Sequence, residues 1–190
     1  MELMKAMRTR RSIRNFQPTP VPQKLIESLL AAAIEAPSPK NAQPWRFVVV
    51  AQKSRDALFA RIRVLVEEEL AAGRIGVCVR ATVRAMEEAP VFVLVYNRAT
   101  ARYSMEKDPV LARVIDVQSI GASIQNMLLA AQEKGLGTLW ICDLLDVDPV
   151  LRLLQTEDEL VAVIALGYPV GDPPRPPRCA LADIVTWQTE

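Results

Sequence analysis

The alternation of apolar and polar positions along the chain predicts helices separated by short strands. Apolar residues recur at three- and four-residue spacing in 3–8 and 22–36, and amphipathic helical patterns follow at 53–72 and 74–88. Short apolar or β-branched runs predict strands at 45–51, 91–97, 135–142 and 160–169, with a short helix at about 147–154. The segment IVTWQ near the end is a candidate for a fifth strand, so the pattern allows four or five strands.

Three segments of this pattern need other parts of the protein around them. The run 91–97, VFVLVYN, is apolar on both faces and predicts a central strand. A polar loop at 98–109 leads into the longest helix, 110–134, which is apolar nearly all round and must be enclosed. The Pro-rich tail, about 170–190, cannot bury much surface on its own chain. We therefore expect 1–190 to form one three-layer α/β/α domain whose tail extends over a second copy.

Composition narrows the class of protein. The chain has 190 residues, of which 51% are apolar and 24% charged, and its 23 basic and 22 acidic side chains nearly cancel. This balance argues against a nucleic-acid partner. The N-terminus has no secretory pattern, and the uncharged run 117–132 is too short and too polar for a membrane span. Three widely spaced cysteines favour reduced thiols and a cytoplasmic location.

The chain contains no histidine, which excludes the common nucleophilic triads and most zinc sites. A bound cofactor could supply the chemistry instead. The acidic run 67–69 is a helical face without further ligands at metal-binding spacing, so we predict no metal site. The Gly135–Gly137 stretch lacks the full glycine spacing of a dinucleotide fingerprint.

Positive charge is concentrated near the N-terminus. In RTRRSIRNF, residues 8–16, arginine occupies positions 8, 10, 11 and 14, although the formal net charge of the chain is only +1. The segment is either a solvated basic loop or a set of guanidinium groups that converge on an anion.

Four stretches, in this order, resemble the nitroreductase family of FMN-dependent NAD(P)H oxidoreductases. They are RRSIRNF (10–16), APSPKNAQPWRFVVV (36–50), QNMLLAAQEKGLGTLWI (125–141) and GYPVGDPPRPPR (167–178). The resemblance runs from about residue 8 to residue 185. It implies an α+β fold with a central mixed sheet of four or five strands, and an intertwined homodimer with FMN at each of two sites in the interface.

The resemblance assigns the first stretch to the flavin phosphate and ribityl chain. Arg10, Arg11, Ser12 and Arg14 take this role, and guanidinium groups suit the dianionic phosphate. The family counterpart of Arg14 lies near the N1–C2=O edge of the flavin, so Arg14 is expected to stabilise the negative charge of the reduced ring.

The second stretch is expected to reach the flavin of the neighbouring subunit. The matching residues are Pro37, Ser38, Pro39 and Asn41. The alternative is a turn that merely ends a helix, with Asn41 capping the following strand. Trp45 is expected in the core.

The third stretch departs from the family. Relatives often continue W-I-G-G-F, whereas this chain has Trp140, Ile141, Cys142 and Asp143, so a carboxylate stands where backbone normally approaches the ring. Cys142 is either a nucleophile or, as we expect, a small buried thiol.

In the tail, the resemblance makes Arg178 a second phosphate ligand. Arg175 either replaces a family lysine or is exposed in a Pro-rich coil.

The resemblance implies ping-pong catalysis. NAD(P)H passes a hydride to N5 of FMN, and a nitroaromatic, quinone or similar small-molecule acceptor then takes the electrons. An alternative is a flavin-remodelling enzyme or a specialised dehydrogenase. A third is a flavin-binding carrier or sensor with little turnover, an idea that Asp143 motivates.

Overall fold

A four-stranded sheet forms the middle layer of the protein. The computed structural model describes residues 2–98 and 108–189. The strands are β1 (Trp45–Ala51), β2 (Val91–Asn97), β3 (Gly137–Ile141) and β4 (Glu159–Gly167), in the order β1-β2-β4-β3. Every neighbouring pair of these strands is antiparallel. The expectation of a mixed sheet was therefore wrong. The one parallel pairing in the described residues is an isolated bridge between Ser12 and Thr138.

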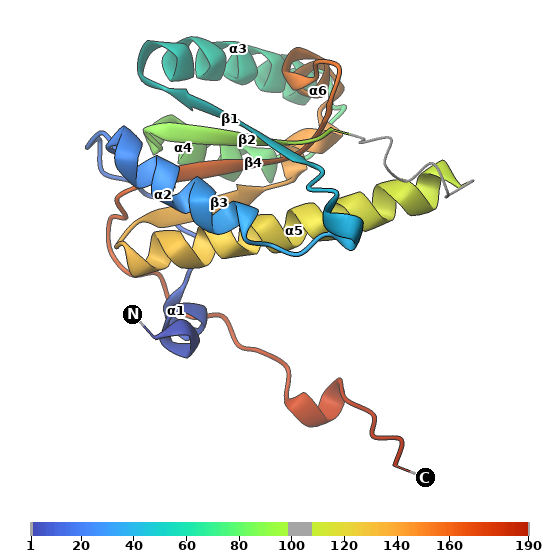
Figure 1. Ribbon diagram of the computed structural model, residues 1–190. Helices are drawn as coiled ribbons and strands as arrows, with labels where there is room; N and C mark the ends of the chain where they lie inside the picture. The colour runs from blue at the N-terminus through green and yellow to red at the C-terminus, as the bar shows by residue number, and fades with distance from the viewer. Residues whose placement is uncertain (1, 99–107, 190) are drawn as a thin grey trace.

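Helices cover both faces of the sheet (Figure 1). On one face lie α3 (Gln52–Ala71), α4 (Val79–Glu88) and α6 (Asp148–Leu154). On the other lie α2 (Gln23–Ile34) and the long α5 (Pro109–Glu133). The short α1 (Leu3–Thr9) packs on α5, where Gln132 Nε2 donates to Thr9 Oγ1 at 3.3 Å. The expected three-layer α+β architecture is confirmed.

Alternating side chains of the inner strands feed two separate cores. In β2, Phe92 and Leu94 join the core under α3, α4 and α6, while Val93 and Val95 join the core under α2 and α5. All seven residues of β2 are buried. The sequence-based prediction of a central strand at 91–97 is therefore confirmed.

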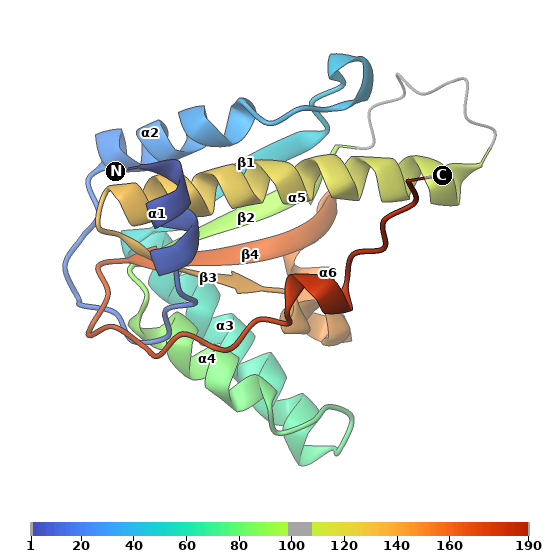
Figure 2. The ribbon, with the colours of Figure 1, turned by 90° about the horizontal axis from the view of Figure 1, so that it is seen from below.

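The start of the longest helix, α5 (Pro109–Glu133), is exposed in the described chain. Asp108 caps its start by accepting from Val110 N at 2.9 Å, and Pro109 suits the first turn. Val110 and Leu111 are 69% and 49% exposed, whereas α1 lies against the opposite end of the helix (Figure 2). Residues 99–107 of the polar loop expected before it lie outside the described residues.

The tail does not form the expected fifth strand. After residue 173 the chain runs as an extended segment away from the body of the domain, with a single short 3-10 helix, η4 (Leu181–Asp183), in its described part (Figure 1). Residues 174–189 are all exposed. Within residues 2–98 and 108–189, the apolar segment IVTWQ has no neighbouring strand with which to pair, so its β propensity is not realised.

Candidate functional site

The arginine-rich segment is hydrogen-bonded to the edge of the sheet. Ile13 N donates to Thr138 O at 2.9 Å, and Gln17 N donates to Tyr168 O at 2.8 Å. Val170 N donates to Asn15 O at 3.0 Å. Ile13 and Phe16 are buried, whereas Ser12, Arg14 and Asn15 are exposed. The sequence thus alternates so that apolar residues anchor the segment and polar ones face outward.

Two glycines allow this close approach. A Cβ on Gly137 would lie 2.7 Å from Ile13 Cγ1, and a Cβ on Gly167 would lie 3.0 Å from Phe16 Cδ1 and 2.6 Å from Pro90 Cδ. At both positions the closest approach is too short for a side chain, so glycine is needed where the segment crosses the strands.

The cationic groups of the segment have no acidic partners. Among residues 2–98 and 108–189, no ion pair involves Arg10, Arg11, Arg14 or Arg178. Burial lowers the pKa of half-buried Arg10, and the neighbouring charges of Arg178 and Arg11 lower it further. The structure therefore brings together arginines from two ends of the chain, as an anion-binding site requires.

Arg11 faces a different cavity from Ser12 and Arg14. Its Nη1 donates to Arg8 O and to Arg10 O, both at 2.8 Å, while its Nε is buried without a hydrogen-bond partner in the described structure. It lines a cavity of about 230 Å³ with Gln132 and Asp172. Ser12 and Arg14 line a neighbouring cavity of about 420 Å³. The two cavities share the loop at Gly171 and Asp172.

The loop 37–41 is a tight, left-handed turn. Lys40, Asn41 and Gln43 have φ of 51°, 53° and 49°, and Ser38 Oγ accepts from Gln43 N at 2.9 Å. Backbone strain of this kind often marks a ligand site. Pro37, Pro39 and Asn41 are exposed, and no described hydrogen bond shows the Asn41 side chain capping the strand.

This loop lies far from the arginine-rich segment within one chain. It follows the C-terminal end of α2, whereas residues 10–16 follow α1 near the opposite end of α5 (Figures 1 and 2). One chain therefore does not bring the two groups of predicted site residues together. A site that uses both needs a second copy.

The four predicted site residues at the end of β3, 140–143, lie in different environments. Trp140 is 38% exposed and lies against α5, where a Cβ on Gly121 would be 3.8 Å from Trp140 Cη2. Ile141 is buried in the core, so only its backbone is available to a ligand. Trp45 is also buried, as expected.

Cys142 is exposed, which corrects the expected buried thiol. The strand ends at Ile141, so the chain leaves the sheet before Cys142. Partial burial of the sulfur raises the pKa of Cys142, a hydrogen bond with Trp140 lowers it, and the charges of Asp143 and Asp146 raise it again. A raised pKa does not favour the nucleophile alternative, since the thiolate is the reactive form.

Asp143 is directed toward α4. Its Oδ2 accepts from Thr82 Oγ1 at 2.5 Å, and both residues are half-buried. In the tail, Arg178 is close enough to affect Arg10, whereas Arg175 is exposed and no described contact joins it to the segment.

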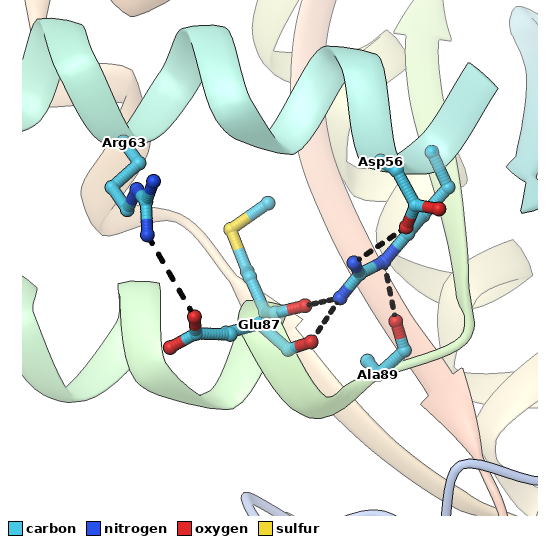
Figure 3. Close-up of polar contacts among 6 residues, drawn as sticks. Asp56, Arg63, Glu87 and Ala89 are labelled. Atoms are coloured by element: carbon cyan, nitrogen blue, oxygen red, sulfur yellow. Dashed lines mark hydrogen bonds and ion pairs between the residues drawn. The ribbon is translucent and has the colours of Figure 1, made fainter. Parts of the chain in front are cut away.

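One residue that positions the site gave no signal in the sequence. Glu88, at the end of α4, accepts from Phe16 N at 3.0 Å across 72 residues of chain. Arg55 fixes this end of α4, because it donates to Ala89 O at 2.8 Å and to the carbonyls of Met86 and Glu87. Figure 3 shows Glu87 and Ala89 at this helix end. Arg55 also pairs with Asp56, and Arg63 Nη1 lies 3.9 Å from Glu87 Oε1.

In the part of the chain that is described, none of the helices combines the length and apolar character needed to span a bilayer.

Comparisons with known proteins agree with this architecture. The sequence profile described as Nitroreductase family matches residues 7–168. A protein of Methanothermobacter thermautotrophicus named for NADH dehydrogenase/NAD(P)H nitroreductase activity is 34% identical over 178 residues, 91% of this chain and 80% of that protein.

Two crystal structures share the fold over the full chain. A BluB-like flavoprotein from Clostridium difficile has a TM-score of 0.80 and 28% identity, covering 100% of both chains. A nitroreductase-type protein from Desulfovibrio desulfuricans, in complex with FMN, has a TM-score of 0.77 and 28% identity, covering 100% of this chain and 98% of that one.

Proposed function

The chain belongs to the nitroreductase family of oxidoreductases, and we propose that it binds FMN between two copies of itself and transfers a hydride from NAD(P)H to a small acceptor. The acceptor class is a nitroaromatic, a quinone or a similar compound. The FMN complex of the related D. desulfuricans protein supports the choice of cofactor.

The observation that carries this proposal is the group of arginines without acidic partners. Arg10, Arg11 and Arg178 lie close enough for the latter two to lower the pKa of Arg10. Like charges gathered at a half-buried position repel one another unless an anion joins them. A phosphate monoester fits, because guanidinium groups bind its oxygens with charge-assisted hydrogen bonds. Arg175 is proposed as a further, weaker contact.

The neighbouring cavity supports the placement of the rest of the cofactor. Ser12 and Arg14 line about 420 Å³ of space next to the loop 170–173. When bound, FMN supplies hydride transfer at N5. Arg14 would hold a fixed positive charge where the ring becomes negative on reduction. The Ser12 hydroxyl would donate a hydrogen bond to the phosphate or ribityl chain. Backbone at 140–143 would border the ring.

The exposed apolar residues support a homodimer. On one chain, large apolar side chains are exposed on α1, at the start of α5 and in the tail: Leu3, Met4, Met7, Val110, Leu111, Val114, Leu181, Ile184 and Trp187. Soluble monomers rarely expose so many. A second copy would cover α5, receive the tail, and bring its Pro37–Asn41 loop to the flavin.

The first experiment is reconstitution of the purified protein with FMN. We expect a yellow dimer with one FMN per chain, which NAD(P)H bleaches and a quinone then reoxidises. Arg14→Ala should retain FMN but lower the midpoint potential, because the reduced ring loses a stabilising charge. A colourless monomer that takes up no FMN would overturn the proposal, and an unchanged potential would overturn the role of Arg14.

Flavin remodelling is the second candidate. The full-length similarity to a BluB-like flavoprotein favours it. The two candidates differ when the reduced protein is exposed to oxygen without another acceptor. A reductase recovers all of its flavin absorbance, whereas a remodelling enzyme loses flavin irreversibly. A carrier or sensor would bind FMN but react slowly with NAD(P)H.

A further inference from the structure

Under the proposed function, with the backbone 140–143 bordering the ring, Asp143 would bring a carboxylate beside the flavin. It follows the exposed Cys142, one residue beyond the end of β3. A free carboxylate there would oppose the negative charge that the flavin gains on reduction. An inference about the role of Asp143 therefore rests on the proposed function.

The structure turns this carboxylate away from the strand end. Thr82 Oγ1, on α4, donates to Asp143 Oδ2 at 2.5 Å. Trp140, three residues earlier, lies instead against Gly121 of α5, in the opposite layer. The side chains of this short stretch therefore diverge, with Trp140 on the α5 side and Asp143 on the α4 side.

No cation shares the task of holding Asp143. In the described parts of the chain, the Asp143 carboxylate takes part in no ion pair and accepts a hydrogen bond from the Thr82 hydroxyl. A short hydrogen bond to an ionised acceptor is among the stronger polar contacts in proteins. Loss of the hydroxyl would leave the carboxylate free to rotate toward solvent and toward Cys142.

We propose that Thr82 is a positioning residue, which keeps the Asp143 carboxylate against α4 and so protects the reduction of the flavin from an opposing charge. The sequence alone could not indicate this role, because 61 residues separate the two side chains.

The test compares Thr82→Val, which keeps the branched shape but lacks the hydroxyl, with Thr82→Ser, which keeps the hydroxyl. The measurement is the midpoint potential of bound FMN, determined against a reference dye. We expect T82V to lower the potential, equivalent to a loss of about threefold to tenfold in the preference for reduced over oxidised FMN, as one nearby charge would cause. T82S should match the wild type.

Asp143→Asn supplies the decisive combination. In the T82V background, D143N should restore the wild-type potential, because no charge is left to misplace. A potential unchanged in T82V would overturn the inference, as would a shift that persists in T82V/D143N. If T82V does not fold, Thr82→Ala permits the same measurement.

The two proposals fail differently. Wild-type protein that binds no FMN would overturn the proposed function, and this inference with it. Wild-type protein that binds and reduces FMN, combined with an unchanged potential in T82V, would overturn only the role of Thr82.

Discussion

The arginine-rich segment and the C-terminal tail contribute to the same charge cluster but are held in opposite ways. Residues 12–17 are hydrogen-bonded to strands or strand ends on both sides, and Ile13 and Phe16 are buried. In contrast, no hydrogen bond within the described structure joins 173–189 to the rest of the chain. Yet Arg178 in this tail lies close enough to Arg10 to lower its pKa.

This difference shows which parts of the proposed site a single chain holds in place and which parts would require a second chain. The arginines of the anchored segment are held in place within one chain, because hydrogen bonds to the edge of the sheet fix the backbone of the segment. The tail exposes Ile184 and Trp187 at 66% and 80%, which is unfavourable unless another surface covers them. Under the proposed function, the cationic half of the site would be formed within one chain, and a second copy would fix the tail and add the loop 37–41.

Removal of the two neighbouring positive charges, Arg10 and Arg178, should have the largest effect. The double variant Arg10→Ala/Arg178→Ala should weaken FMN binding by about 100-fold to 10,000-fold, since each of the two lost hydrogen bonds to a charged group contributes roughly 1.5–3 kcal/mol. Fluorescence titration of the apoprotein with FMN measures the loss. Riboflavin, which lacks the phosphate, should bind the variant and the wild type about equally.

Arg61→Ala is the matched control, because Arg61 is an exposed arginine of α3 with no ion pair in the described structure. It should leave FMN affinity unchanged. Equal losses for FMN and riboflavin in R10A/R178A would show that the arginines do not recognise phosphate.

A charge in the tail tests whether a partner covers it. Ile184→Asp should convert the dimer to monomer at micromolar concentration, because burial of an isoleucine contributes about 1.5–3 kcal/mol and a buried carboxylate adds a penalty. Sedimentation velocity measures the change. Val64→Asp, at a 55% exposed apolar position on α3, should leave the dimer intact. A dimer that persists in I184D would mean that the tail lies free.

Closer packing of the anchored segment should have a smaller effect. A Cβ in Gly137→Ala would lie 2.7 Å from Ile13 Cγ1, so the segment must shift. Overpacking of this kind costs about 1–3 kcal/mol, measurable by urea unfolding, and it should also weaken FMN binding. In Gly76→Ala the Cβ would lie 3.5 Å from Cys78 Sγ, an ordinary contact, and stability should stay the same or rise. Equal stability of G137A and the wild type would mean that the segment is loosely held.

The sequence predicted the elements that follow from local pattern. The strands 45–51 and 91–97 agree with β1 and β2 residue for residue, because each is a compact apolar run between clear breaks. The helices agree less well at their ends, since α4 begins at Val79 rather than at 74. Positions 72–78 form turns around Gly73 and Gly76 that interrupt an otherwise helical pattern.

Contacts between distant segments could not be predicted. The Glu88 contact with Phe16 N and the Thr82 contact with Asp143 join residues 72 and 61 positions apart, and neither has a sequence motif. The strand expected in the tail was wrong for a related reason. The propensity of IVTWQ is local, whereas a strand requires a neighbour, and none of the described strands in this chain pairs with that segment.

The smallest expected effect concerns Cys142, which reports on the end of β3. Partial burial and the charges of Asp143 and Asp146 raise its pKa above the ordinary 9.0, so little thiolate exists at pH 8 and alkylation should be slow. In a Cys78→Ser/Cys179→Ser background, the rate should climb as pH rises through this pKa. Asp143→Asn should lower the pKa and speed alkylation at pH 8 by about twofold to fivefold, since the rate follows the thiolate fraction.

Asp148→Asn is the control, because the Asp148 carboxylate is not among the groups that shift the pKa of Cys142. Added FMN should slow alkylation in the wild type if the flavin covers the end of β3. Riboflavin at the same occupancy should protect equally, since the ring and not the phosphate would shield the sulfur. Protection by inorganic phosphate alone would instead place the anion site beside Cys142, contrary to the assignment of Arg10 and Arg178.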